Sequence, residues 1–494
     1  MSTSEKLFAQ AERATDWMNP ILVKETRQAF KSRQFIITFF LLLVVAWLIS
    51  AAGALWAGPA LEYGTAGRAF FVFYFYVLAF AILFVVPFGA FRSMLNEKEQ
   101  NTYELLSIST LSPRQIVSGK MCSALVQIFI YYSAIAPFMA FTSLLQGFDL
   151  ALVTLYLVGA LAWAICVSMI SITLSTLSNQ RQWQAMNTLA MVILLFWQFG
   201  MIFPLTAIGM SETVPFDDPD FWWGLASAGV ATASYFVLSM QIAVSRLTFE
   251  SDNRSTRIRI ICSIQFWGLW GFLLAYHLWN GSGSVDEHMV SVLAGISLIH
   301  WLVVGLFAAT ESEFLSRRVR RTLPETSVLR WIVAPLFPGG SRGFLFMLSH
   351  LLALCLIVYV GAWPDWLNWV YAGALYVICF VGFGALVGRL AHAVTPEFRP
   401  AHARVLTVLI ALFAMVAPYL VTALGLTRPT STYSLMFISN PFSTLPVIAD
   451  FGTSGLTDVI LIMLGGVAAL ATILNLRAML RGVFGVAPYR PPVS

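Results

Sequence analysis

The stretch QFIITFFLLLVVAWLISAAGALWA, residues 34–57, decides the fold class of this chain because it is 24 residues long and contains no charged side chain. A helix needs about 20 mostly apolar residues to cross the roughly 30 Å hydrocarbon core of a bilayer. Lipid offers the backbone no hydrogen-bond partners, so such a segment must be helical. The 33 residues before it are too many for the basic start of a secretory signal, so we expect a retained membrane span.

The composition of the whole chain agrees with a membrane protein. Of 494 residues, 59% are hydrophobic and 11% are charged, whereas soluble domains have about 25% charged residues. We therefore predict an all-α polytopic membrane protein with about twelve transmembrane helices in two six-helix halves. The predicted spans are 34–57, 69–91, 119–145, 150–177, 184–209, 221–245, 260–279, 289–309, 343–363, 367–388, 403–425 and 456–476.

The charges are sorted by side. If the N-terminus is cytoplasmic, 27 of the 29 Lys and Arg residues lie inside, and only Arg68 and Arg428 lie outside. Lys and Arg are enriched in cytoplasmic loops of membrane proteins, and this bias sets orientation. We therefore expect both termini in the cytoplasm and the chain in the cell inner (plasma) membrane. The same bias explains the net positive charge, so we expect contact with membrane lipid and no nucleic-acid partner.

The N-terminal region, residues 1–33, contains an amphipathic segment, NPILVKETRQAFKSR, at residues 19–33. Asn19 is a good helix N-cap and Pro20 suits the first helical position. We expect a short elbow helix that lies in the membrane interface and leads into the first span. A six-span unit follows at 34–250, and a second at 251–494.

The loop after the second span, residues 92–119, is the richest polar stretch of the first unit. With Lys120 it reads RSMLNEKEQNTYELLSISTLSPRQIVSGK. A simple connection would need only a few residues, and carboxylates do nothing for orientation. We therefore predict a docking surface for a cytoplasmic partner. Its expected contact residues are Glu97, Glu99, Thr102, Glu104, Leu105, Leu106, Pro113 and Arg114.

The second unit repeats this layout in outline. Its long cytoplasmic loop, residues 310–342, carries a basic cluster, and the sequence leaves lipid headgroups and the same partner open as its target. A later segment, residues 433–452, is apolar, too short to span and interrupted by Pro, so we expect it to re-enter the outer leaflet. The basic cluster consists of Arg317, Arg318, Arg320 and Arg321.

No sequence pattern indicates chemistry within this chain. It lacks a phosphate-binding Walker motif and the H-E-x-x-H and G-x-S-x-G motifs of hydrolases. The five cysteines fall inside predicted spans, and the six histidines lack metal-ligand spacing. The histidines are expected near span ends or in loops. We therefore expect a non-enzymatic chain with no catalytic, cofactor-binding or metal-binding residue.

Residues 15–245 resemble the permease subunits of type-2 ATP-binding-cassette (ABC) exporters in two stretches. One is the 19–33 segment, which is similar to the elbow helix of that family. The other runs from the acidic pair Glu97 and Glu99 to Gly119-Lys120, with Asn101 where the family usually has Gly. The second half shares only the layout and an NPF element at 440–442.

The resemblance implies that the loop from Glu97 to Pro113 is a coupling helix docked on a separate ABC ATP-binding subunit. ATP and Mg would bind to that partner, and transport would be driven from outside this chain. A second copy of the permease or a related permease would complete the pathway. The implied function is the permease subunit of an ATP-driven exporter.

The sequence leaves two alternatives open. A twelve-span secondary carrier of the major-facilitator type would share the span count. It usually needs an ionisable group within the membrane, and the spans contain no clear midplane Asp, Glu, Lys or Arg. A membrane-embedded scaffold or lipid-modifying protein would require a polar cluster at an interface, and the sequence shows none.

Overall fold

A computed structural model confirms the predicted fold class. Throughout the described residues the secondary structure is helical, with no strand, and twelve helices are long and apolar enough to cross a membrane. The chain divides into two compact units, Met1–Thr248 and Phe249–Ser494. The structure describes residues 19–56, 66–99, 111–143, 150–177, 180–211, 214–249, 251–280, 287–324, 326–361, 365–395, 397–424, 433–451 and 455–485.

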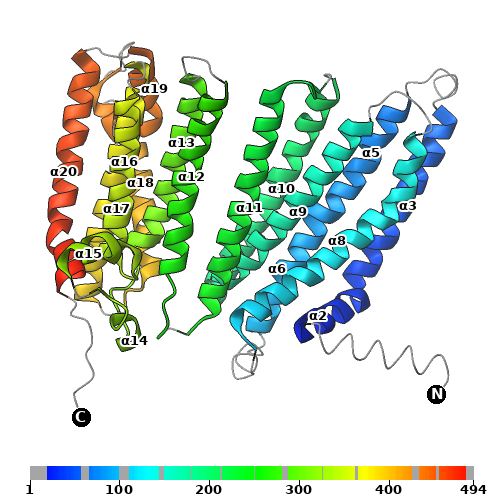
Figure 1. The fold of residues 1–494 in the computed structure, drawn as a ribbon, viewed down its shortest axis with the longest axis horizontal. Coiled ribbons are helices and arrows are strands. Elements are labelled where there is room, and N and C mark those ends of the chain that lie inside the picture. Colours follow the sequence, from blue (N-terminus) through cyan, green and yellow to red (C-terminus); the bar gives the residue numbers. More distant parts are fainter. Residues whose placement is uncertain are drawn as a thin grey trace. The chain divides into compact units, whose positions relative to one another are not determined.

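The described residues of unit 1 include six of the candidate spans and a short helix, α2, that precedes them (Figure 1). Its elements are α2 (Pro20–Lys31), α3 (Arg33–Trp56), α5 (Ala66–Phe80), the π-helix η1 (Ala81–Val85), α6 (Val86–Glu99), α8 (Pro113–Ser143), α9 (Leu150–Thr176), α10 (Arg181–Ser211) and α11 (Pro219–Leu247).

Unit 2 holds the other six candidate spans and several short helices between them. Its elements are α12 (Thr256–Asn280), α13 (Glu287–Ala309), α14 (Arg317–Arg320), α15 (Ser327–Val333), η2 (Ala334–Leu336), α16 (Gly340–Val360), η3 (Asp365–Asn368), α17 (Trp369–Val394), α18 (Pro400–Ala423), η4 (Leu435–Ser439), α19 (Pro441–Phe451) and α20 (Gly455–Phe484).

The predicted elbow helix is present as α2. The Asn19 side chain accepts a hydrogen bond from the Ile21 backbone N–H, and Pro20 occupies the first turn. Its buried positions are Ile21 and Glu25, one helical turn apart. They face α8, which packs along α2 at the lower end of unit 1 in Figure 1. The helix is therefore held by contacts with α8.

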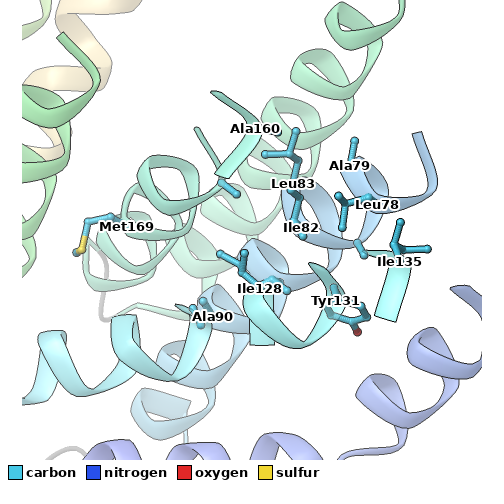
Figure 2. Close-up of a cluster of buried hydrophobic side chains, with 14 of the residues drawn as sticks. Leu78, Ala79, Ile82, Leu83, Ala90, Ile128, Tyr131, Ile135, Ala160 and Met169 are labelled. Carbon is cyan, nitrogen blue, oxygen red and sulfur yellow. The ribbon is translucent and has the colours of Figure 1, made fainter. Parts of the chain in front are cut away.

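The core of unit 1 lies where α5, η1, α8 and α9 meet. Figure 2 shows side chains from these helices gathered together, with Leu78 and Ile82 near Ile128 and Ile135. All four of these side chains are fully buried. Such close packing, rather than a hydrophobic drive, holds helices together in lipid.

The second span contains a π-helical turn at a point that a proline explains. Pro87 has no N–H to donate to the carbonyl of Leu83, four residues earlier, and the helix is wider here as η1. The Leu83 carbonyl instead accepts a hydrogen bond of 2.6 Å from Gln198 Nε2 on α10. Gln198 Oε1 in turn accepts from Trp163 Nε1 on α9, at 3.2 Å. Gln198 on α10 thus connects the π-helical turn of the second span to α9.

The structure bears on the predictions for the second span, the segment expected to re-enter and the histidines. The second span is longer than predicted, because the helix continues through Arg92 to Glu99. The segment expected to re-enter forms η4 and the eleven-residue helix α19, which packs against α17. The expectation that histidines lie near span ends was wrong for His300 and His350, which lie within α13 and α16.

Candidate docking face at the basic end of unit 1

Each unit has one end that carries nearly all of its Lys and Arg side chains. We call it the basic end, and the charge bias predicts that it faces the cytoplasm. In unit 1 the described residues of this end include α2, the last turns of α6 and the first turns of α8. The helices α6 and α8 flank residues 100–110, the middle of the predicted coupling loop, which lie outside the described residues.

A buried charge network joins these three helices. Lys120 Nζ on α8 lies 2.9 Å from Glu25 Oε1 on α2 and donates to Ser93 Oγ on α6 at 2.8 Å. The Ser93 hydroxyl donates onward to Glu25 Oε2 at 2.6 Å. The Lys120 side chain is only 2% exposed, and a buried charge must be paired and hydrogen-bonded to be tolerated.

A second carboxylate completes the network. Glu97 Oε2 lies 3.1 Å from Lys120 Nζ, and Glu97 Oε1 accepts from Lys24 Nζ at 3.0 Å. Lys24 is more than half exposed, so this outer pair contributes less than the inner one. Two carboxylates and two ammonium groups therefore balance each other where α2, α6 and α8 meet.

Gly119 allows the close approach of α2 to α8 that the network requires. A Cβ at this position would lie 2.9 Å from the Ile21 Cβ, which is closer than real side chains come. Asn19 Nδ2 also donates to the Gln115 carbonyl at 2.6 Å. Gly119 and Lys120 therefore act together, because Gly119 leaves room for α2 and Lys120 binds the Glu25 carboxylate of that helix.

The network favours the charged form of Glu25. Burial alone would raise its pKa, but the Lys120 ammonium and the hydrogen bond from Ser93 outweigh burial and lower the pKa below its ordinary value of 4.5. Glu25 is therefore ionised at neutral pH and holds α2 electrostatically.

An open cavity of about 360 Å³ lies between α6 and α10, and none of the network residues lines it. Its lining includes the charged side chains of Arg92, Glu99 and Arg181. All three are exposed. Within the described part of the chain none of them has a hydrogen bond or ion pair. These charges are available to another molecule, unlike those of the buried network.

The predicted docking residues fall into three groups: those at least partly exposed, one that is buried, and those outside the described residues. Glu99 and Arg114 are exposed, and Pro113 is half-buried at the start of α8. Glu97 is 8% exposed and pairs with Lys24 and Lys120, so its carboxylate is directed into the protein rather than toward a partner. Thr102, Glu104, Leu105 and Leu106 lie outside the described residues.

The long loop of unit 2 is held by a buried arginine. Arg259 on α12 is 2% exposed and donates to Glu311 Oε2 at 2.6 Å and to the Phe337 carbonyl at the same distance. Its guanidinium also donates to the Pro335 and Gly339 carbonyls. Arginine suits this position because its planar fork carries five donors. One side chain thus fixes both ends of the loop.

A second arginine, Arg342 near the start of α16, secures the loop to α20. It donates to the Gly482 carbonyl at 2.9 Å and to the Pro338 carbonyl at 2.6 Å. Gly339 adopts a left-handed φ of 129° between these groups, a conformation that favours glycine. Glu313 accepts from the Ser341 backbone N–H at 2.6 Å. The carboxylates that begin this loop are therefore used within unit 2.

The basic cluster of this loop lies on its surface. Arg317, Arg318 and Arg320 form α14, and all three are exposed, as is Arg321. Arg318 pairs with Asp252 at 2.7 Å, with most of the arginine side chain in solvent. The structure thus brings the four arginines together on one exposed element.

Sequence reasoning missed four residues that organise these ends. Glu25, Ser93, Arg259 and Arg342 were not predicted as site residues. A carboxylate one turn after Ile21 on an apolar face was a signal for Glu25. Two arginines at the first turns of long apolar helices were a signal for Arg259 and Arg342, but the positive-inside bias also explains them.

No family model, curated protein or solved structure matches this chain. The class of protein rests on the fold alone: the chain is a multi-pass membrane protein, and its described residues include twelve candidate membrane-spanning helices. Of the residues that the structure describes, no three His, Cys, Asp or Glu side chains form a group that could hold a metal ion. The five cysteines are free and lie within candidate spans, as predicted.

Proposed function

We propose that this chain is the transmembrane permease subunit of an ATP-driven ABC transporter of the export type. A separate ATP-binding subunit would bind ATP and Mg in the cytoplasm and dock on the loop at residues 100–110. The membrane chain would convert the movement of that subunit into movement of its spans in the inner membrane.

The observation that carries this proposal is the buried junction of α2, α6 and α8. Lys120 contacts Glu25 on α2 and Ser93 and Glu97 on α6. The helices α6 and α8 are the two that enter and leave the predicted docking loop. A force applied to this loop would therefore move three helices together, because separating them would leave buried charges unpaired.

The exposed charges of the cavity between α6 and α10 support a partner surface. Arg92, Glu99 and Arg181 line an open cavity and have no internal partner among the described residues. Mixed exposed charges of this kind favour electrostatic steering of a complementary protein. The resemblance of the 19–33 and 97–120 stretches to type-2 exporter permeases points to the same kind of partner.

The rival function with a specific observation in its favour is an ion-coupled secondary carrier. His300 and His350 lie within spans of unit 2, and the His350 ring stacks on Trp301 with centroids 4.2 Å apart. A titratable group inside a span is a feature of proton relays. However, His350 has local partners in Ser263 and the Phe346 carbonyl, which explain it as part of helix packing.

Co-purification tests the proposal. We expect the chain, expressed with ATP-binding subunits encoded beside its gene, to form a complex that survives purification. Glu104→Arg should abolish it, because the reversed charge lies in the centre of the predicted coupling helix. Asp458→Arg, an equal charge reversal at an exposed position on the opposite side, is the control and should not.

Reconstitution separates the two functions. Proteoliposomes that contain the complex should move substrate only with ATP and Mg. Transport by the isolated chain under a proton gradient, without any ATPase, would reject the permease proposal and favour the secondary carrier.

A further inference from the structure

The long loop of unit 2 is a folded element with a small core of its own. Leu315, Val319, Leu323 and Phe337 are buried against one another, and Val333 packs beside them. Together with the Arg259 and Arg342 clamps, this core gives the loop a defined surface. The side chains on the outside of this loop therefore have defined positions.

The helix α15 within this loop exposes apolar side chains. Val328 and Ile332 are 75% and 68% exposed, and Leu329 and Trp331 are about half exposed. Exposed apolar area costs roughly 25 cal/mol per Å² in water, and large apolar patches mark interaction sites. The apolar surface of α15 therefore requires a covering partner.

The position of α15 places this surface at the end of a membrane span. Trp331 packs edge-on against Phe484, the last residue of α20, with ring centroids 5.7 Å apart. Figure 1 shows α15 beside the lower end of α20. Tryptophan is enriched where spans meet lipid headgroups, so α15 lies at the level of the membrane surface.

The charge of the neighbouring helix matches an anionic membrane. Arg317, Arg318, Arg320 and Arg321 are exposed on and just after α14, and Arg330 is part of α15. Apolar anchors beside clustered arginines are the pattern of segments that lie on anionic bilayers. A protein partner would have to complement both surfaces at the same level as the headgroups.

We propose that residues 314–324 and 326–333 form a membrane-surface anchor whose α15 inserts Val328 and Ile332 into the cytoplasmic leaflet while the arginines around α14 bind the phosphates of anionic lipids. This inference does not depend on the permease proposal. It assigns the basic cluster to lipid and leaves the ATPase-docking role with unit 1.

Site-directed spin labelling in nanodiscs tests the anchor, in a full-length chain whose five native cysteines are replaced by alanine. A nitroxide at Ile332→Cys should be accessible to oxygen and protected from a water-soluble nickel complex. Ile299→Cys, on an outward face of α13, marks the bilayer interior, and Glu397→Cys, exposed between α17 and α18, marks water. Accessibility at Ile332 equal to that at Glu397 would overturn the proposal.

The arginines are tested with the same label. Raising the share of phosphatidylglycerol over phosphatidylcholine should deepen the Ile332 label, and this dependence should disappear when all four arginines of the cluster are changed to Gln. A control with the same charge loss at other exposed positions should keep it. The control positions are Arg27, Lys31, Arg257 and Arg477.

The rival occupant gives a different result. If the four arginines instead bind the ATP-binding subunit, their replacement would abolish co-purification and leave the lipid dependence of the label unchanged. That outcome would reject the membrane anchor. Retained co-purification with a lost lipid dependence supports it.

Discussion

Lys120 Nζ lies 2.9 Å from Glu25 Oε1, which joins the third predicted span to a helix that ends before the first span begins. Both side chains are at least nine-tenths buried. The pair attaches α2 to the helix bundle of unit 1. The buried pair is tolerated because Glu97 and the Ser93 hydroxyl provide further partners for the Lys120 ammonium, and Ser93 also donates to the Glu25 carboxylate.

Replacing Lys120 by Met should destabilise unit 1 by about 3–5 kcal/mol, because the buried Glu25 carboxylate would lose its cation and Glu97 would keep, among the described residues, only Lys24. Lys24→Met is the matched control, since this ammonium is 54% exposed and its loss should cost at most about 1 kcal/mol. Thermal unfolding in detergent measures both. Equal unfolding temperatures for the two variants would contradict the role of Lys120.

Gly119→Ala should separate α2 from α8. The added methyl group would come within 2.9 Å of Ile21, and overpacking of this kind costs about 1–3 kcal/mol. Gly159→Ala is the control, since a Cβ there meets nothing within 4 Å and Ala is the better helix former. We expect faster proteolysis at residues 19–32 in Gly119→Ala and an unchanged rate of proteolysis there in Gly159→Ala.

Acid should weaken the junction in a defined direction. The pKa of Glu25 is lowered in the folded state, so its contribution to stability is complete above 4.5, the ordinary pKa, and is lost as pH falls below it. The difference in unfolding temperature between the wild type and Glu25→Gln should therefore shrink as pH falls through this range. A difference that grows on acidification would contradict the sign.

The sequence predicted the spans well because hydropathy is a local property. A run such as residues 34–57 can satisfy its backbone in lipid only as a helix, whatever surrounds it. The cap at Asn19 was predictable for the same reason, since the residues that form it are adjacent. Element type and approximate bounds therefore followed from residues close together in the chain.

The buried networks could not be predicted in this way. Glu25 and Lys120 are 95 residues apart, and their pairing depends on how α2 crosses α8. Glu97 was assigned to a partner surface because cytoplasmic carboxylates do nothing for orientation. The helix instead continues past Glu97, which is buried. The extension of α6 by eight residues beyond the predicted span end was the difference that mattered.

The π-helical turn in the second span should depend on Gln198. Its side chain supplies the hydrogen bond that Pro87 cannot donate to Leu83. Gln198→Leu would leave this carbonyl and the Trp163 indole without their partner, at a cost of about 1–2 kcal/mol. Gln127→Leu, which removes only a bond within its own helix, should cost less. Thermal unfolding of the two variants provides the comparison, and equal losses would contradict it.

Arg259→Met should release the long loop of unit 2, because Glu311 and three backbone carbonyls would lose their shared donor. Removing one partner of a buried pair costs about 3–5 kcal/mol, and here the loss falls on a segment with a small core. We expect protease cleavage between residues 311 and 339 while the spans remain intact. Arg257→Met, two residues earlier on α12 and exposed, should leave this segment resistant to the protease. Cleavage of both variants at equal rates would show that Arg259 does not hold the loop.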